Sequence, residues 1–233
     1  MTSQEIIQKA RAEGRVLLTE TESKELIKES GIAVIETKLA RSISEVVAIS
    51  NQMGYPVVLK IASHDITHKS DAGGVKLGLL TPEAVGKAYE EIFTSVAQKY
   101  PSVAVQGVTV QKTARPGVEV IIGMFKDAQF GPVLMFGLGG IWVEILKDVS
   151  FRIVPLTKKD AASLIREIKG FPLLEGRRGR EAVDIVNLEE ALLKLSAFVE
   201  KYPEIKELDL NPIFAYADGC LAVDARIILE TKP

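Results

Sequence analysis

The sequence contains a single cysteine, which excludes a disulfide within the chain. Cys220 lies in an apolar, strand-like run, where a buried structural thiol is expected and a catalytic role is not. Long hydrophobic runs are also lacking. The longest, residues 121–125 and 132–136, are far shorter than the roughly 20 residues that a membrane-spanning helix needs. We therefore expect no association with a membrane.

Neither sign of charge is in excess. Lys and Arg total 29, and Asp and Glu total 31, so no large net field attracts the chain to a nucleic-acid backbone. We expect no nucleic-acid partner. Residues 1–14 alternate charged and apolar side chains at helical spacing and lack the apolar core of a signal peptide. The chain is therefore expected to stay in the cytoplasm.

Common nucleotide-binding signatures are missing as well. There is no GxxxxGK[ST] motif and no HRD or DFG motif, so a site of the P-loop or protein-kinase type is excluded. The run Gly137-Leu-Gly-Gly is rich in glycine but fits no dinucleotide fingerprint. A nucleotide site in this chain must be built in another way.

The order of the expected elements indicates two α+β subdomains. In the first part of the chain helices alternate with short strands, and Thr81-Pro-Glu begins a long helix that runs to about Tyr100. From Gly107 onward, strands follow one another with Pro and Gly at the turns. This pattern favours an α+β fold over a doubly wound parallel sheet, with subdomains at residues 1–107 and 108–233.

Lys60 is the first candidate for chemistry. It comes at the end of the apolar run Val57-Val-Leu-Lys-Ile, where a long cationic side chain can leave the core and bind a phosphate as a point charge. The alternative is a structural lysine whose apolar stem lies along the core while its ammonium group reaches water. Lys60 by itself does not decide between these roles.

Residues 64–75 gather both histidines of the chain, His64 and His68, with a glycine pair. Paired glycines let backbone amides approach an anion closely. Neutral imidazole is nucleophilic near pH 7, so a histidine here could act as a base or carry a phosphoryl group. Metal binding is less favoured, because two histidines four apart on a non-helical stretch lack the spacing of a zinc site. The alternative is a solvated polar loop.

The third candidate site lies in the C-terminal strands. Asp209 and Asn211 are two residues apart and so point to the same face of a strand. Asp224 comes alongside Asn211 if the two strands pair as a hairpin around Tyr216. Oxygen ligands of this kind suit Mg²⁺ when water and nucleotide phosphates fill its other positions. The alternative is the exposed polar face of an antiparallel sheet.

Together the three features indicate one chemistry. A basic strand end, an amide-rich loop and a carboxylate–amide pair can hold a triphosphate and Mg²⁺ for phosphoryl transfer. The segments that carry this set are GYPVVLKI, HKSDAGGVKLGL, GPVLMFGLGGIWVEILKDVSFRIVPL, ELDLNPI and a later VDAR. Their combination resembles the ATP-grasp subunit of ADP-forming acetyl-CoA synthetases over nearly the whole chain. ELDLNP is shared more widely, with succinyl-CoA synthetase β subunits. The resemblance implies an ATP-grasp fold, with the nucleotide between two α+β subdomains.

The resemblance also assigns roles to single residues. It implies nucleotide binding by residues of both subdomains: Lys60, Gly73, Gly74 and Val75 at the phosphates, Gln111 and Lys112 beside the adenine, and Glu119 facing the ribose or the hinge. Asn211 and Asp224 match the Mg²⁺ ligands, and Asp209 matches the carboxylate that orients a phosphohistidine. His68 matches the second histidine of the family's relay, which receives the phosphoryl group from a histidine of the partner subunit.

The implied reaction converts acyl-CoA, ADP and phosphate reversibly into acid, CoA and ATP, with ATP/ADP and Mg²⁺ as cofactors. Succinyl-CoA synthetase β subunits continue into another domain, whereas this chain ends at Pro233, nine residues after Asp224, and no GxGxxG module for CoA is present. We therefore expect a CoA-binding alpha subunit as partner, in an assembly with two copies of each subunit.

Two other functions stay open. One is an ATP-grasp carboxylate ligase that forms an acyl phosphate directly and needs no phosphohistidine. The other is a regulatory subunit that senses nucleotide without chemistry, although Lys60, Asn211 and Asp224 form a set that a sensor has less need of.

Overall fold

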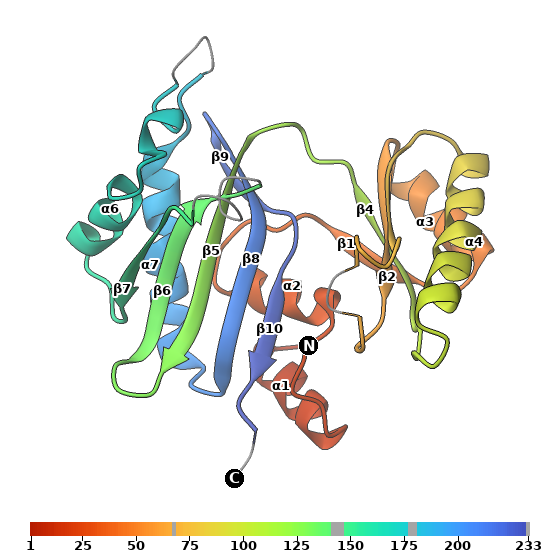
Figure 1. Cartoon of the computed structure of the whole chain (residues 1–233), viewed down its shortest axis with the longest axis horizontal. Coiled ribbons are helices and arrows are strands. Elements are labelled where there is room, and N and C mark those ends of the chain that lie inside the picture. Colours follow the sequence, from red (N-terminus) through yellow and green to blue (C-terminus); the bar gives the residue numbers. More distant parts are fainter. Residues whose placement is uncertain (67–68, 141–146, 177–180, 232–233) are drawn as a thin grey trace. The chain divides into compact units, whose positions relative to one another are not determined.

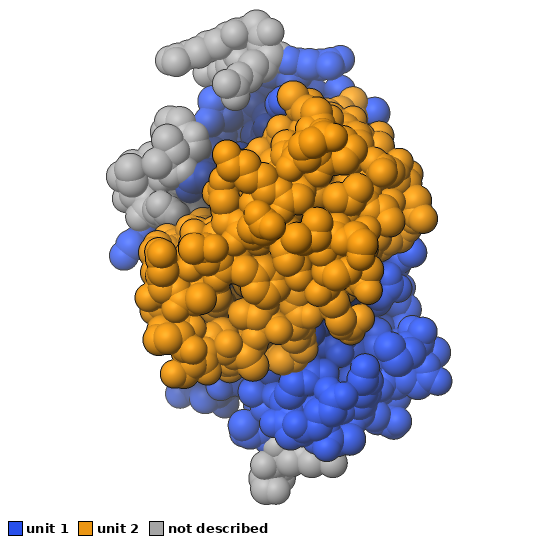
Figure 2. All heavy atoms as spheres, turned by 90° about the vertical axis from the view of Figure 1, so that its right-hand side faces the viewer, with its two compact units in different colours: residues 1–34, 116–233 blue, residues 35–115 orange. Residues whose placement is uncertain are grey.

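The computed structural model describes residues 1–66, 69–140, 147–176 and 181–231. These residues form two compact units, coloured separately in Figure 2: a small unit within residues 35–115, and a large unit within residues 1–34 and 116–233. Each unit contains one antiparallel sheet and several helices (Figure 1), which confirms the predicted α+β class. No described helix is both long and apolar enough to cross a membrane.

The small unit is a four-stranded sheet with two helices packed on it. The strands in spatial order are β1 (Thr37–Ala40), β4 (Gly107–Lys112), β2 (Val57–Ala62) and β3 (Val75–Leu79). The helices are α3 (Ile43–Met53) and α4 (Pro82–Lys99). The hydroxyl groups of Ser42 and Thr81 cap them by accepting a hydrogen bond from the backbone N–H three residues later. The helix predicted from Thr81 to about Tyr100 is confirmed by α4.

One face of the small sheet forms the core of this unit. Its residues alternate along the strands, as period-two patterning requires, and pack with α3 and α4 in one apolar cluster that includes Val57, Leu59, Ile61, Val108 and Val110. Lys60 lies between two of them on β2 and so points to the other face, called here the second face of the small sheet.

The large unit is a six-stranded sheet with four α-helices in its core. The strands in spatial order are β10 (Arg226–Leu229), β8 (Ile205–Tyr216), β5 (Val118–Asp127), β6 (Gly131–Leu138) and β7 (Val149–Ile153), and β9 (Gly219–Ala222) also pairs with β8. The helices are α1 (Ser3–Ala12), α2 (Glu20–Glu29), α6 (Lys158–Arg166) and α7 (Ile185–Lys201), with a short 3-10 helix η1 (Phe171–Leu173).

Alternation along β8 separates the two faces of the large sheet. Leu208 and Leu210 are buried in the apolar cluster that contains the helices. Glu207 and Asp209 alternate with them and point to the opposite side, called here the second face of the large sheet. Lys60 and Asp209 therefore lie on the sheet faces opposite the apolar clusters of their units.

The N-terminal segment belongs to the large unit. The backbone N–H of Leu18 donates to the carbonyl oxygen of Ile227 at 3.0 Å, and the N–H of Leu229 donates to that of Val16 at 2.8 Å. Glu29 at the end of α2 accepts hydrogen bonds from Lys201 and Tyr202 at the end of α7. Both helices bury apolar side chains in the same core as the six-stranded sheet.

The units thus differ from the predicted division into residues 1–107 and 108–233. The start of the chain returns to the C-terminal sheet, because α1 and α2 bury their apolar faces there. Strand β4, at the predicted boundary, pairs with both β1 and β2 and is part of the small sheet. Order along the chain does not reveal such long-range pairing, so the sequence pattern placed the boundary at the change in element type.

Candidate functional site

Three polar side chains share the second face of the small sheet. In the register of β2 and β4, Lys60 lies directly opposite Thr109, and Gln111 lies opposite Val58. Directly opposed residues of an antiparallel pair point to the same side, as do residues two apart. The three side chains are buried, with exposed fractions of 7% for Lys60, 3% for Thr109 and 2% for Gln111. Burial of Lys60 inside its strand does not fit a lysine whose ammonium group reaches water at a strand end.

Gln111 and Lys112 point to opposite faces of the sheet. They are consecutive on β4, and only Gln111 shares the face of Lys60. Lys112 is exposed at the end of the strand. The structure therefore does not bring these two predicted adenine contacts together through their side chains.

The glycine pair has a local structural role. Gly73 has a φ of +69°, a conformation that side chains disfavour. A Cβ on Gly74 would lie 2.4 Å from Cγ2 of Ile61 and 3.0 Å from the carbonyl oxygen of Lys69. The N–H groups of Gly73 and Gly74 already donate to the carbonyl oxygens of Ser70 and Lys69, at 2.9 and 2.8 Å. The pair closes the loop and starts β3, and their contact with a phosphate stays a prediction.

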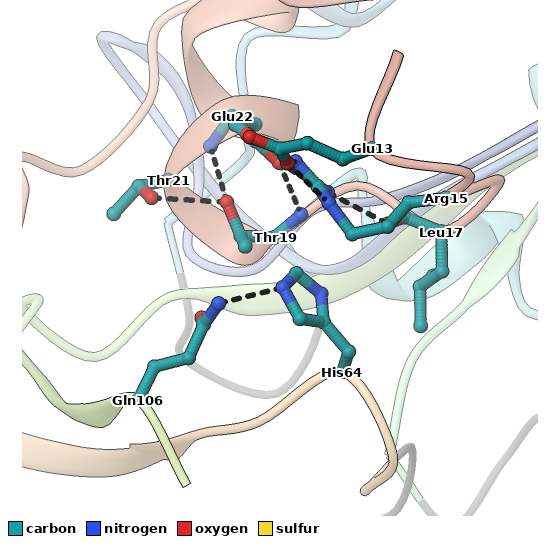
Figure 3. Close-up of polar contacts among 8 residues, drawn as sticks. All are labelled: Glu13, Arg15, Leu17, Thr19, Thr21, Glu22, His64 and Gln106. Carbon is teal, nitrogen blue, oxygen red and sulfur yellow. Dashed lines mark hydrogen bonds and ion pairs between the residues drawn. The ribbon is translucent and has the colours of Figure 1, made fainter. Parts of the chain in front are cut away.

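Val75 and the two histidines belong to the same segment of the sequence but differ in what can be said of their positions. Val75, the first residue of β3, lies directly opposite Lys60. His68, the predicted phosphoryl carrier, lies outside the described residues. His64 is described: its Nε2 lies 2.6 Å from the side-chain amide nitrogen of Gln106 (Figure 3). Because an amide nitrogen only donates, Nε2 of His64 accepts this hydrogen bond.

The start of the histidine loop is thus tied to the segment before β4. Besides the His64–Gln106 pair, the hydroxyl of Ser63 donates to the carbonyl oxygen of Ala104 at 2.8 Å. The N–H of Gln106 donates to the carbonyl oxygen of Ala62 at 2.8 Å, which continues the β2–β4 ladder to the base of the loop. Residues 62–64 therefore have a fixed position within the small unit.

In the large unit, β8 and β9 form the hairpin that was predicted for the C-terminal strands. Ile213 pairs with Ala222 and Tyr216 pairs with Gly219. The N–H of Val223 donates to the carbonyl oxygen of Pro212 at 2.9 Å, so the register continues past the end of β9. One further step of this register would place Asp224 opposite Asn211. The predicted hairpin is confirmed, and the role of these two residues as oxygen ligands stays a prediction.

Asp209 lies in the centre of the large sheet. It is opposite Gly123 of β5 on one side and Arg226 of β10 on the other. Burial raises the pKa of Asp209, the charge of Arg226 acts against this rise, and the charge of Asp224 adds to it. The charge of Asp224 thus disfavours the ionised form of Asp209, and a cation in this region would oppose that effect.

Arg226 was missed as a candidate, although it is the last residue of the VDAR segment. The sequence carried a partial indication of its importance, because Arg226 lies two residues after the candidate ligand Asp224. Its place beside Asp209, however, depends on the pairing of β10 with β8, which no local pattern reports.

Glu119 lies on the second face of the large sheet but apart from Asp209. It is opposite Phe214 and four residues along β5 from Gly123, the partner of Asp209, which is a separation of roughly 13 Å at about 3.3 Å per residue. A Cβ on Gly139 would lie 2.9 Å from Cβ of Glu119, and one on Gly140 would lie 3.2 Å from its carboxylate. The glycine run after β6 therefore makes room for Glu119.

A metal site made of protein acids alone is not seen in the described part of the chain. No group of three or more His, Cys, Asp or Glu side chains is arranged to hold an ion there. Asn211 and Asp224 supply an amide oxygen and a carboxylate, which is a fitting pair for a hard cation that completes its shell with water or phosphate oxygens.

Comparison with known proteins gives matches over nearly the whole chain. The model of the ATP-grasp domain family matches residues 9–229. The beta subunit of acetate–CoA ligase (ADP-forming) I from Pyrococcus furiosus is 51% identical over 97% of this chain and 97% of its own length. Acetate–CoA ligase (ADP-forming) I from Archaeoglobus fulgidus is 42% identical over 97% of this chain, which corresponds to 33% of that longer polypeptide.

Solved structures agree. Dinucleotide-forming acetyl-coenzyme A synthetase 1 from Candidatus Korarchaeum cryptofilum, in complex with coenzyme A and Ca-AMPCP, superposes with a TM-score of 0.96 at 48% identity, over 98% of this chain and 100% of that chain. In another structure of that protein, with coenzyme A and Mg-AMPPCP, a phosphohistidine segment points towards the nucleotide-binding site (TM-score 0.87, 46% identity, 98% of this chain and 100% of that chain).

Proposed function

The chain belongs to the ATP-grasp family, among the beta subunits of ADP-forming acetate–CoA ligases, and we propose that it is the nucleotide-binding subunit of such a ligase. The reaction is acyl-CoA, ADP and phosphate to acid, CoA and ATP, in either direction. A CoA-binding alpha subunit performs the acyl chemistry, and this chain transfers the phosphoryl group to ADP. One observation carries the proposal: the full-length match to beta subunits is accompanied by a β8–β9 hairpin whose register leads from Asn211 towards Asp224, a residue whose charge acts on Asp209.

Each residue of the site has a physical task. The ammonium group of Lys60 neutralises phosphate charge at the middle of the small sheet. Asn211 and Asp224 hold Mg²⁺, which supplies neutralisation of charge on the phosphate oxygens during transfer. The other proposed contacts are Gly73, Gly74 and Val75 at the phosphates, Gln111 and Lys112 at the adenine, and Glu119 at the ribose. The register of the small sheet supports the assignment of Gln111, because its side chain lies on the same face as Lys60.

His68 is the proposed carrier. The N–P bond of its phosphohistidine breaks while a bond forms between phosphorus and an oxygen of the β-phosphate of ADP, and the imidazole leaves as a neutral ring or takes up a proton. A carboxylate hydrogen-bonded to the distal N–H of the ring sets its tautomer and stabilises its positive charge. Asp209 supplies this carboxylate, and Arg226 beside it favours its charged form.

The assembly contains two copies of each subunit in this proposal. In the longer relatives the matching region is about one third of a single polypeptide, so the other functions of those enzymes reside in the remaining two thirds. We place the complex in the cytoplasm, where ADP and acyl-CoA are present.

Acid-quench labelling tests the relay. The complex of this chain with its CoA-binding subunit is incubated with γ-³²P-ATP and Mg²⁺, and the label on this chain is measured after acid and after base treatment. We expect an acid-labile, base-stable label that His68→Ala abolishes. His64→Ala is the matched control and keeps the label, because Nε2 of His64 is already engaged by Gln106.

The alternatives give other results. A label that His68→Ala leaves unchanged overturns the relay and favours a ligase that forms an acyl phosphate directly. A complex that binds ADP but shows no ligase activity in either direction favours a nucleotide sensor.

A further inference from the structure

Large apolar side chains are exposed on strands β5 and β7 of the large unit and in the turn after β5. The exposed fraction is 40% for Phe125 on β5, 45% for Phe151 and 51% for Ile153 on β7. Phe130, in the turn between β5 and β6, is 58% exposed. Single exposed apolar residues are common on folded proteins, whereas contiguous ones mark interaction surfaces.

Strand register makes these side chains contiguous. Phe125 lies opposite Val133, which lies opposite Ile153, so the three form a row across β5, β6 and β7. The next row contains Met135 and Phe151. The rings of Phe125 and Phe151 meet edge to face, with centroids 6.2 Å apart. We call these five residues, Phe125, Val133, Met135, Phe151 and Ile153, the aromatic face; its strands run side by side in Figure 1.

The helices that the structure describes in the large unit pack on the other face of this sheet. Neighbouring residues on the same strands, Met124 and Leu134, point the other way into the helix-packed core. Arg152, between Phe151 and Ile153, is bonded to Ser163 of α6 and to Glu167, which shows that the helix side of β7 is already occupied. The aromatic face is therefore the second face of the large sheet.

The aromatic face continues into the proposed catalytic region. One cross-strand row contains Arg226, Asp209, Gly123, Met135 and Phe151, in the order β10, β8, β5, β6, β7. Neighbouring strands are about 4.8 Å apart, so Met135 lies about 10 Å from Asp209 along this row. A molecule that sits on the aromatic face therefore adjoins the carboxylate proposed to orient the phosphohistidine.

We propose that the aromatic face is the docking surface for the CoA-binding subunit. The inference rests on the proposed function, in which a phosphoryl group must reach this chain from that subunit. Two observations favour this occupant. The face adjoins Asp209 on one continuous sheet surface, and the relatives that carry this region within a longer polypeptide join it to about twice its own length of further chain. Aromatic residues and Met are enriched at interfaces between proteins, and the aromatic face contains both kinds.

The test measures affinity for the partner subunit. A double variant, Phe151→Thr with Ile153→Thr, removes two exposed side chains and keeps residues that favour strands. The matched control, Leu77→Thr with Leu80→Thr, removes leucines that are 72% and 67% exposed elsewhere. We expect the Kd for the CoA-binding subunit to rise at least tenfold in the first variant and less than threefold in the control. Both variants should bind ADP with Mg²⁺ as the wild type does.

Each result bears on one claim. If the wild-type chain does not bind the CoA-binding subunit at all, the proposed function fails. If wild type and double variant bind it equally, only the docking surface is overturned. A wild-type chain that forms a dimer by sedimentation, which the double variant dissolves, assigns the face to a second copy and also overturns the inference.

A second measurement tests the docking surface even if the double variant does not fold. Ile153→Cys places a thiol on the face, and burial raises the pKa of the native Cys220 thiol to about 11, which keeps its maleimide reaction slow at pH 7. We expect the CoA-binding subunit to slow the labelling of residue 153 at least fivefold. An unchanged labelling rate in the assembled complex overturns the docking surface.

Discussion

The small and the large sheet are built alike and differ in what they present on their second faces. Each is antiparallel and buries one face against helices. The small sheet presents Lys60 with two neutral polar side chains, Thr109 and Gln111. The large sheet presents Asp209 and, two strands further, an apolar surface. Both cores thus arise from the same alternation of apolar and polar residues along the strands. The opposite faces differ: the small unit carries the cation, and the large unit carries the carboxylate and the apolar surface.

The largest effect is expected where the small sheet differs most from the large one. Lys60→Met should weaken binding of ADP by about 30- to 100-fold, because a charge-assisted hydrogen bond to phosphate contributes about 2–3 kcal/mol. Calorimetric titration with Mg²⁺ and ADP measures this. Lys87→Met is the matched control, since Lys87 lies on α4 and its side chain is 78% exposed. Equal losses in both variants would show that the position of Lys60 on the sheet does not decide nucleotide binding.

The glycine loop beside Lys60 gives the next largest effect. Gly74→Ala places a Cβ 2.4 Å from Ile61 and close to a backbone oxygen, and should destabilise the chain by about 1–3 kcal/mol. Gly86→Ala, within α4, meets only Ile43 at 3.6 Å and should stabilise it by up to about 1 kcal/mol. Urea unfolding of both variants measures the two signs. A harmless Gly74→Ala would mean that the loop does not need its close contact with β2.

The carboxylate of the large sheet should show a pH-dependent effect. Since the pKa of Asp209 is raised, the folded chain binds its proton more tightly than the unfolded chain does. Ionised Asp209 therefore costs stability, and this cost appears as pH rises through its raised pKa. Asp209→Asn should increase the free energy of unfolding at pH 7 without Mg²⁺ or nucleotide, by at most about 1 kcal/mol.

The gain from Asp209→Asn should vanish at pH 3, where the carboxyl group is protonated in both states. Urea titrations at the two pH values measure it. Arg226→Gln is the companion variant, because it removes the charge that opposes the rise and should therefore enlarge the cost of ionised Asp209. A loss of stability in Asp209→Asn at pH 7 would contradict this electrostatic description of the large sheet.

The smallest effect tests the N-terminal segment of the large unit. Hydrogen bonds from Ser3, Tyr202 and Lys201 hold the pKa of the Glu29 carboxyl well below its usual range. Ionised Glu29 therefore stabilises the folded chain at pH values above the ordinary pKa of a glutamate carboxyl group. This stabilisation is lost as the pH falls through the lowered pKa of Glu29. Glu29→Gln should cost less than about 1 kcal/mol at pH 7, because the carboxylate is partly exposed. An identical pH dependence of unfolding in variant and wild type would remove Glu29 as a link between α2 and α7.

Sequence patterns predicted the local features well. The cap at Thr81 and the helix that follows it depend on residues three or four apart, and α4 begins and ends close to the predicted positions. The hairpin of β8 and β9, which turn residues and alternation specify, is confirmed by the observed register. Family resemblance supplied the ATP-grasp fold, which the full-length matches confirm.

Long-range pairing was beyond the same patterns. Period-two alternation separates Gln111 from Lys112, yet only the packing of α3 and α4 reveals which of the two faces points away from the core. Glu119 lies beside Gly139 and Gly140 because β5 pairs with β6. Arg226 reaches Asp209 through the pairing of β10 with β8. Each of these depends on which strand a given strand joins.

The sequence by itself thus determined the helix starts, the alternation of the strands, the C-terminal hairpin and the membership of the ATP-grasp family. Only the tertiary structure decided that residues 1–34 pack with the C-terminal sheet, that Arg226 flanks Asp209 and that the aromatic face is contiguous. The physical reason is the range of the interactions. Caps and tight turns act within a few residues, whereas the burial of apolar surface selects among all strand and helix partners at once.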